Sequence, residues 1–155
     1  MDRDTEDLYD LLKSKVRILT LSQLAGLAAQ VLSPAARNIA CALVEAFRGN
    51  RTRSRLYLKK AESSCTGEAE LCYILHFGAM ALAYAGDMDA ALEKDKRSLD
   101  LCDRLGLKRL QADVLSSMSA MYGALGQAHL AAAYSDEADR MGLEGETDSG
   151  TGRQR

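Results

Sequence analysis

The residues that could best bind a metal are Cys72 and His76. Their spacing of four places them one turn apart on one face of a helix, and Cys65 stands a few residues before them. A structural zinc site needs four closely grouped ligands, and a fourth is missing here. The four cysteines (Cys41, Cys65, Cys72, Cys102) show no C-x-x-C spacing. We therefore expect no metal, and reduced thiols in the core.

Few residues could support catalysis. His76 and His129 are the only histidines, and neither stands in a Ser-His-Asp pattern or near a nucleophile elbow. Gly123 and Gly126 are better explained as a packing glycine and a turn than as a loop that cradles phosphate. We expect a protein that is not an enzyme and that needs no cofactor.

A basic run offers a second kind of chemistry. Arg51, Arg55 and Lys59 are spaced i,i+4,i+8, which places three cations on one side of a helix. Such a row could bind successive phosphates of a nucleic acid. The outer face of a helix that only contacts solvent has the same spacing of cations. An acidic protein partner, including the chain's own N-terminal Asp-Glu cluster, would also fit this row. Without interleaved aromatics or a helix-turn-helix pattern, nucleic acid is an unlikely partner.

The elements that must position these residues are best defined around Gly86. Residues 71–86 carry no charge and predict a buried helix, which Gly86 ends in a left-handed conformation. Asp87 is expected to cap the next helix. That helix, over residues 88–105, has one apolar stripe, and its Glu93–Arg97 and Asp100–Arg104 pairs have the favoured i,i+4 order.

The same turn recurs along the chain. Gly126 follows Gly86 by forty residues, and Gly49 precedes it by thirty-seven. Ser33 and Pro34 form a strong helix start. The predicted helices accordingly span residues 34–47, 52–65, 71–86, 88–105, 108–125 and 127–141, with Gly142 and Leu143 as the last C-cap.

These paired helices resemble tetratricopeptide repeats over residues 35–141, on the spacing of large, small, aromatic, glycine and alanine positions. The middle unit matches with Leu75, Gly78, Ala79, Leu82, Gly86, Ala91 and Ser98. The last matches with Leu115, Met118, Ser119, Tyr122, Gly126, Ala131 and Ala138, and the first, more weakly, with Asn38, Cys41, Ala42, Glu45, Gly49, Ser54 and Ala61. The family's tryptophan and terminal proline are absent, and Glu45 replaces an aromatic. A generic array of helical hairpins is the alternative.

The resemblance implies an all-α solenoid whose first helices line a concave groove. Carried over by position, the partner-binding residues of this groove would be Phe47, Tyr73, His76, Phe77, Met80 and Tyr84. An apolar groove with Met and Tyr suits a peptide or an amphipathic helix, so the expected function is a protein-protein interaction scaffold or adaptor. Coverage of the groove by the chain's own N-terminal helices or by a second copy, as in a homodimer, is the competing hypothesis. A sensor domain of a bacterial transcriptional or signalling system is the alternative function.

Composition agrees with one helical domain. The 155 residues include one proline, and 5% are aromatic, which suits helices packed on Ala and Leu. A net charge of -2 opposes global attraction to nucleic acid or to a membrane, and an acidic N-terminus is unlike a signal peptide, so we expect a cytoplasmic protein. Residues 1–33 are predicted to form a helical cap or a degenerate repeat. They carry two apolar stripes, the first over Leu8, Leu11, Leu12, Val16 and Leu19 and the second over Leu24, Leu27, Ala28, Val31 and Leu32. Residues 34–142 would form three hairpins and residues 143–155 a disordered tail.

Overall fold

The described part of the chain is entirely helical. The computed structural model describes residues 23, 26 and 33–150, with side chains as far as residue 144. Gln23 and Gly26 are helical; the rest of the predicted N-terminal cap and the end of the tail lie outside the described residues. Within the described residues there are no strands, and the helices are α3 (Pro34–Phe47), α4 (Arg51–Ser63), α5 (Glu68–Tyr84), α6 (Met88–Leu105), α7 (Lys108–Ala124) and α8 (Ala128–Gly150).

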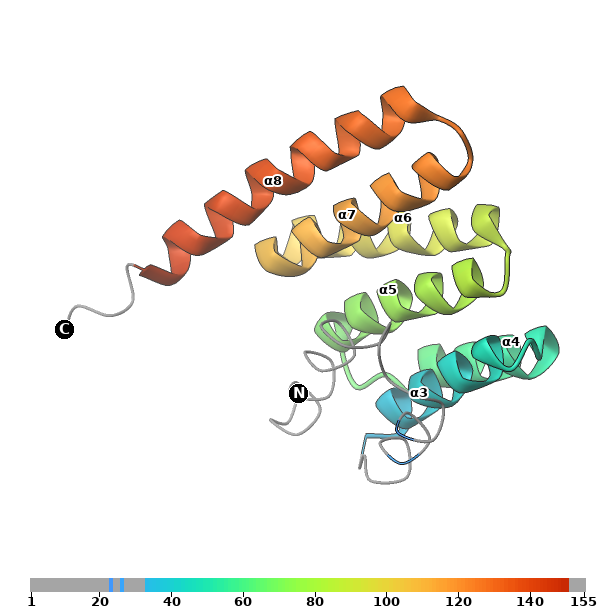
Figure 1. Cartoon of the computed structure of the whole chain (residues 1–155). Helices are drawn as coiled ribbons and strands as arrows, with labels where there is room; N and C mark the ends of the chain where they lie inside the picture. The colour runs from blue at the N-terminus through green and yellow to red at the C-terminus, as the bar shows by residue number, and fades with distance from the viewer. Residues whose placement is uncertain (1–22, 24–25, 27–32, 151–155) are drawn as a thin grey trace.

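These helices form three hairpins, α3 with α4, α5 with α6 and α7 with α8, and packing is densest within each pair. The hairpins stack in chain order from α3 to α8 (Figure 1), with α3 against α5 and α6 against α7. The protein is therefore an all-α helical-repeat fold, and the predicted fold class is confirmed. The predicted bounds of its first five described helices agree with the structure to within three residues.

The turn inside each hairpin is the same. Gly49, Gly86 and Gly126 have φ angles of 77°, 82° and 75°, the left-handed region that only glycine enters cheaply. In each case the N–H of the next residue donates to the carbonyl five positions before it, at 2.8 to 2.9 Å. This is the 6→1 hydrogen bond of the Schellman motif, which satisfies free carbonyl groups at the C-terminal end of a helix. The predicted recurrence of one turn at the three glycines is confirmed.

The two helices of each hairpin approach closely at a pair of small residues. In the first hairpin Ser54 Oγ donates to the carbonyl of Ala42 at 2.8 Å, and in the third Ser119 Oγ donates to the carbonyl of Ala131 at 2.7 Å. The middle hairpin has Ala79 and Ala91 at the same positions relative to its glycine, both fully buried. Small side chains here allow the backbones to pack closely.

The entry to the array is fixed by polar contacts around Ser33. Its Oγ accepts from the N–H of Ala36 at 3.3 Å, so the predicted cap before Pro34 is confirmed. The same hydroxyl donates to Glu70 Oε1 at 2.8 Å, and Glu70 Oε2 accepts from the N–H and hydroxyl of Thr66 at 2.9 Å. One buried carboxylate thus ties the start of α3 to the start of α5.

Two details of the predicted helix ends differ from the structure: the cap bond of Asp87, whose position before α6 is as predicted, and the end of α8. Asp87 makes no side-chain cap bond, because its carboxylate pairs with Arg55 of the preceding hairpin. Gly142 and Leu143 do not end α8, which continues to Gly150 and runs past the start of α7 (Figure 1). A glycine inside a helix costs only about 1 kcal/mol, and the Arg140–Glu144 ion pair at 3.0 Å spans this position. Residues 143–150, which the sequence assigns to the tail, are therefore part of α8 in this structure.

Candidate functional site

The candidate site is the face of the inner helices α3, α5 and α7, where the sequence predicts a groove. At its edge the rings of Phe47 and Tyr84 lie 4.6 Å apart between centroids and are tilted by 47°. Tyr84 is 40% exposed and Phe47 is half-buried. These two residues stand two positions before Gly49 and Gly86, so the repeat itself brings them together.

The six predicted groove residues do not form one surface. Tyr73 and Met80 are half-buried and pack against the core. Phe77 is completely buried and His76 is 3% exposed, so neither is open to a partner, and their assignment to an accessible groove is wrong. Phe77 belongs instead to the hydrophobic core that runs through the described helices.

Burial along the inner face changes from one end of the array to the other. Ten positions before each turn glycine stand Ile39, His76 and Ser116, of which the first two are buried and the third is exposed. Six positions before it stand Leu43, Met80 and Ala120, which are buried, half-buried and exposed, respectively. The accessible part of the face therefore begins near Met80 and extends over α7.

Behind this face, His76 and Asp95 form a buried polar pair. Nδ1 of His76 lies 2.9 Å from Oδ1 of Asp95, whose side chain is fully buried. Oδ2 of Asp95 has no hydrogen-bond partner among the described residues. The corresponding positions after the other turn glycines are Leu58 and Ser135, so this pair is particular to the middle hairpin. The signal in the sequence was an acid inside the apolar stripe of the second helix.

The cysteines of the middle hairpin are structural thiols. Cys72 and Cys102 are fully buried. The Cys72 thiol donates to the carbonyl of Glu68 at 3.2 Å, and Ser98 Oγ donates to the carbonyl of Cys72 at 2.8 Å. Burial raises the pKa of the Cys102 thiol to about 12 and also raises the pKa of Cys72. A thiol that stays protonated is a poor nucleophile and a poor metal ligand. In the part of the chain that the structure describes, no group of three or more His, Cys, Asp or Glu side chains is placed to hold a metal.

The predicted basic row on α4 is partly engaged with the next hairpin. Arg55 forms an ion pair with Asp87, and the guanidinium of Arg51 lies beside Gly86, 3.1 Å from where a Cβ would stand. Lys59 is exposed. The row therefore helps to join two hairpins, which makes it a weaker surface for phosphates.

The cations of α6 also contact other elements. Arg104 pairs with Glu68 of α5 at 2.7 Å, and Arg97 lies 4.0 Å from Glu62 of α4, which also binds Lys94. The predicted pairs of Arg97 with Glu93 and of Arg104 with Asp100 are not the ones that form. Acidic residues on neighbouring helices pair with these cations. The spacing of residues within one helix could not predict these partners.

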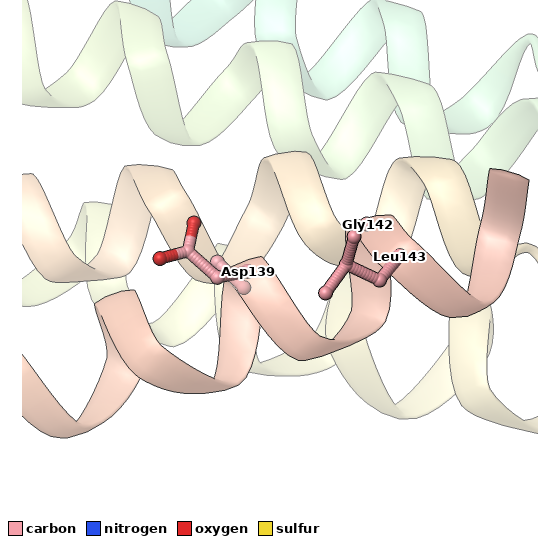
Figure 2. Close-up of a pocket in the computed structure, with 4 residues that line it drawn as sticks. Asp139, Gly142 and Leu143 are labelled. Carbon is pink, nitrogen blue, oxygen red and sulfur yellow. The ribbon is translucent and has the colours of Figure 1, made fainter.

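A shallow hollow on α8 offers little for a ligand. It is lined by Ala138, Asp139, Gly142 and Leu143, and Figure 2 shows that its labelled residues come from successive turns of a single helix. One carboxylate and one exposed leucine do not converge on a common point. We assign no site to it.

None of the described helices has both the length and the hydropathy that crossing a bilayer requires. Comparisons with protein-family models, with curated proteins and with solved structures found no match to this chain.

Proposed function

We propose that this chain is a non-catalytic interaction scaffold of the tetratricopeptide type, which binds a peptide or an amphipathic helix on the open part of its inner face. The observation that carries the proposal is the Phe47–Tyr84 ring pair, with Tyr84 40% exposed at the edge of that face. The solvent-exposed ring of Tyr84 and the half-buried Met80 together form an apolar surface. Surfaces of this kind are typically buried by the apolar side chains of a partner.

The chemistry of the face favours an apolar ligand. No lysine or arginine occupies the inner positions Ile39, Leu43, His76, Met80, Ser116 or Ala120, so nothing there would clamp a terminal carboxylate. Binding would come from burial of apolar area, at roughly 25 cal/mol per Å² before the costs of association. The exposed serine and alanine of α7 would let a helix approach closely.

The test is a panel of synthetic amphipathic helical peptides, measured for binding by fluorescence anisotropy. Tyr84→Ser combined with Met80→Ser should abolish binding and leave helicity unchanged. Leu56→Ser is the matched control, because Leu56 is 51% exposed on α4, outside the inner face. Binding that survives the double substitution, or that Leu56→Ser removes, would refute the proposal.

Two other functions use different features of the chain. Nucleic-acid binding through α4 is less favoured, since Arg55 is paired with Asp87. An affinity for duplex DNA that falls steeply as the salt concentration rises would support this function instead. A sensor domain of a bacterial regulatory system would use the same inner face, so the identity of the bound peptide distinguishes it from an adaptor.

A further inference from the structure

The joint between the first two hairpins defines which sides of their second helices face each other. Glu62 of α4 binds Lys94 of α6 and lies 4.0 Å from Arg97 of the same helix. Counted from the turn glycines, the acid stands thirteen positions after Gly49, and the two cations stand eight and eleven positions after Gly86. Because the turns have the same conformation, position thirteen marks the exit side of a second helix, and positions eight and eleven mark its entry side.

The exit side of the last second helix, α8, is acidic and exposed. Asp139 stands thirteen positions after the turn glycine, and Asp136 lies one helical turn before it. Both are exposed. Neither forms an ion pair with another described side chain, and the nearby Arg140 is held by two glutamates of the same helix. Leu143, one turn further on, is 67% exposed. This side of α8 therefore presents two carboxylates and a leucine to solvent.

The entry side of α4 is basic and exposed. Lys60 stands eleven positions after the turn glycine, the place that Arg97 occupies on α6, and Arg53 lies two turns before it. Both are exposed, and no ion pair within the described residues holds either of them. The Nζ atom of Lys60 lies 5.4 Å from the centroid of the Tyr57 ring. Leu56, between the two cations, is 51% exposed. This side of α4 is the opposite of the α8 side in charge.

The signs of these charges decide which surfaces can meet. Helices α4 and α8 belong to the first and the last described hairpins, at opposite ends of the stack (Figure 1), so the two sides cannot meet within one molecule. Two copies joined through α8 alone would bring aspartates together, and two joined through α4 alone would bring cations together; both arrangements are repulsive. Helix α8 of one copy against α4 of another places Asp139 opposite Lys60, in the register that Glu62 and Arg97 already have.

We propose that copies of this chain associate head to tail, with the Asp136–Asp139 side of α8 in one copy against the Arg53–Lys60 side of α4 in the next. The contact uses different surfaces on the two copies, so it continues into chains or rings and does not stop at a two-fold dimer. A contact between single helices buries less than the roughly 1,000 Å² of a stable interface, so it forms at high protein concentration. It does not involve the inner face and does not depend on the proposed function.

Sedimentation velocity of the full chain at rising protein concentration measures this association. In low salt the weight-average sedimentation coefficient should rise without a plateau at the dimer. At about 1 M salt, where the Debye length is about 3 Å, the rise should disappear. Asp136→Lys with Asp139→Lys should lower the association constant by at least about tenfold, and so should Arg53→Glu with Lys60→Glu.

The matched control is Asp100→Lys with Asp103→Lys. These two acids are exposed on α6 and have the same spacing as the pair on α8, so the control makes the same change in net charge away from the joint. It should leave the association constant nearly unchanged. An equal loss in the control would overturn the proposal, because it would show attraction between whole molecules and not a contact between two sides.

A mixture of the two charge-reversed proteins separates the proposed contact from other interfaces. Each protein alone presents like charges at the joint. In the mixture the new lysines of one protein meet the new glutamates of the other, and the unchanged sides remain complementary, so the association of the wild type should return. Circular dichroism reports the fold of each variant. A chain that is monomeric at every concentration, a dimer that survives both reversals, or a mixture that stays monomeric would refute the head-to-tail contact.

Carbodiimide coupling in the unmodified chain gives a second measurement that needs no substitution. The reagent joins a carboxylate to a lysine amine with loss of water, so it should link Asp139 to Lys60. In an equimolar mixture of unlabelled chains and chains labelled with heavy nitrogen, half of the linked peptide pairs should contain one peptide of each kind. Links found only within one molecule, or only between other residues, would contradict the proposed arrangement.

Discussion

The substitution His76→Leu should strongly destabilise the protein, because it removes the side chain that hydrogen-bonds the buried carboxylate of Asp95 among the described residues. His76 Nδ1, at 2.9 Å, is the described partner of Oδ1, and Oδ2 has none among the described residues. Removing one member of a buried pair typically costs about 3 to 5 kcal/mol, a large part of the roughly 5 to 15 kcal/mol that holds a domain folded. Urea denaturation followed by circular dichroism measures this loss.

Removing both members should give a different result. Asp95→Val in the His76→Leu background leaves no buried charge to desolvate, so the double variant should regain most of the loss and could exceed the wild type by about 1 to 4 kcal/mol. Asp95→Val alone leaves an unpaired imidazole and should cost about 1 to 3 kcal/mol. A double variant as unstable as His76→Leu would show that packing, and not the unpaired charge, sets the cost.

Three further predictions concern packing, ionisation and backbone conformation. Ala79→Leu should cost about 1 to 3 kcal/mol by overpacking the interface within the middle hairpin, whereas Ala120→Leu on the exposed face should be nearly neutral; equal effects in urea melts would contradict the repeat register. Because the folded state keeps the Cys102 proton up to about pH 12, while an unfolded thiol loses it near pH 9, the unfolding free energy should fall as pH rises through this window. Cys102→Ala should make that fall shallower, and an unchanged slope in urea midpoints would refute the assignment. Gly126→Ala should destabilise by about 1 to 2 kcal/mol, since its φ is 75°, while Gly142→Ala in the interior of α8 should stabilise by roughly 0.5 to 1 kcal/mol; the same sign for both in thermal melts would be inconsistent with this structure.

The turns are the part of this fold that the sequence predicts best. Glycine adopts the left-handed conformation at the lowest energetic cost of all residues. The hairpin turns can therefore be located from Gly49, Gly86 and Gly126 alone, without information on residues distant in the chain. The apolar periodicity between them then determines the helices. The end of α8 was harder to predict, because a glycine inside a helix costs only about 1 kcal/mol and helix α8 continues through Gly142.

The site was harder to predict because accessibility depends on contacts between hairpins. The apolar residues of α5 look alike in sequence, yet Phe77 is fully buried in the core and Tyr84 is 40% exposed. An aromatic at a groove position and an aromatic in the core differ only in what lies across from them. The partner of Asp95 was likewise hidden, since His76 lies nineteen residues away on another helix.

The ion pairs between the first two hairpins have a mechanical consequence. Glu62 of α4 binds Lys94 and lies near Arg97, and Arg55 binds Asp87, so charge helps to set the angle at this joint. These side chains are partly exposed, and each such pair contributes no more than about 1 kcal/mol and weakens as salt is added. The angle between the first two hairpins should therefore vary more widely as the ionic strength rises. Spin labels at Lys59 and Lys96 would record this as a longer or broader distance distribution.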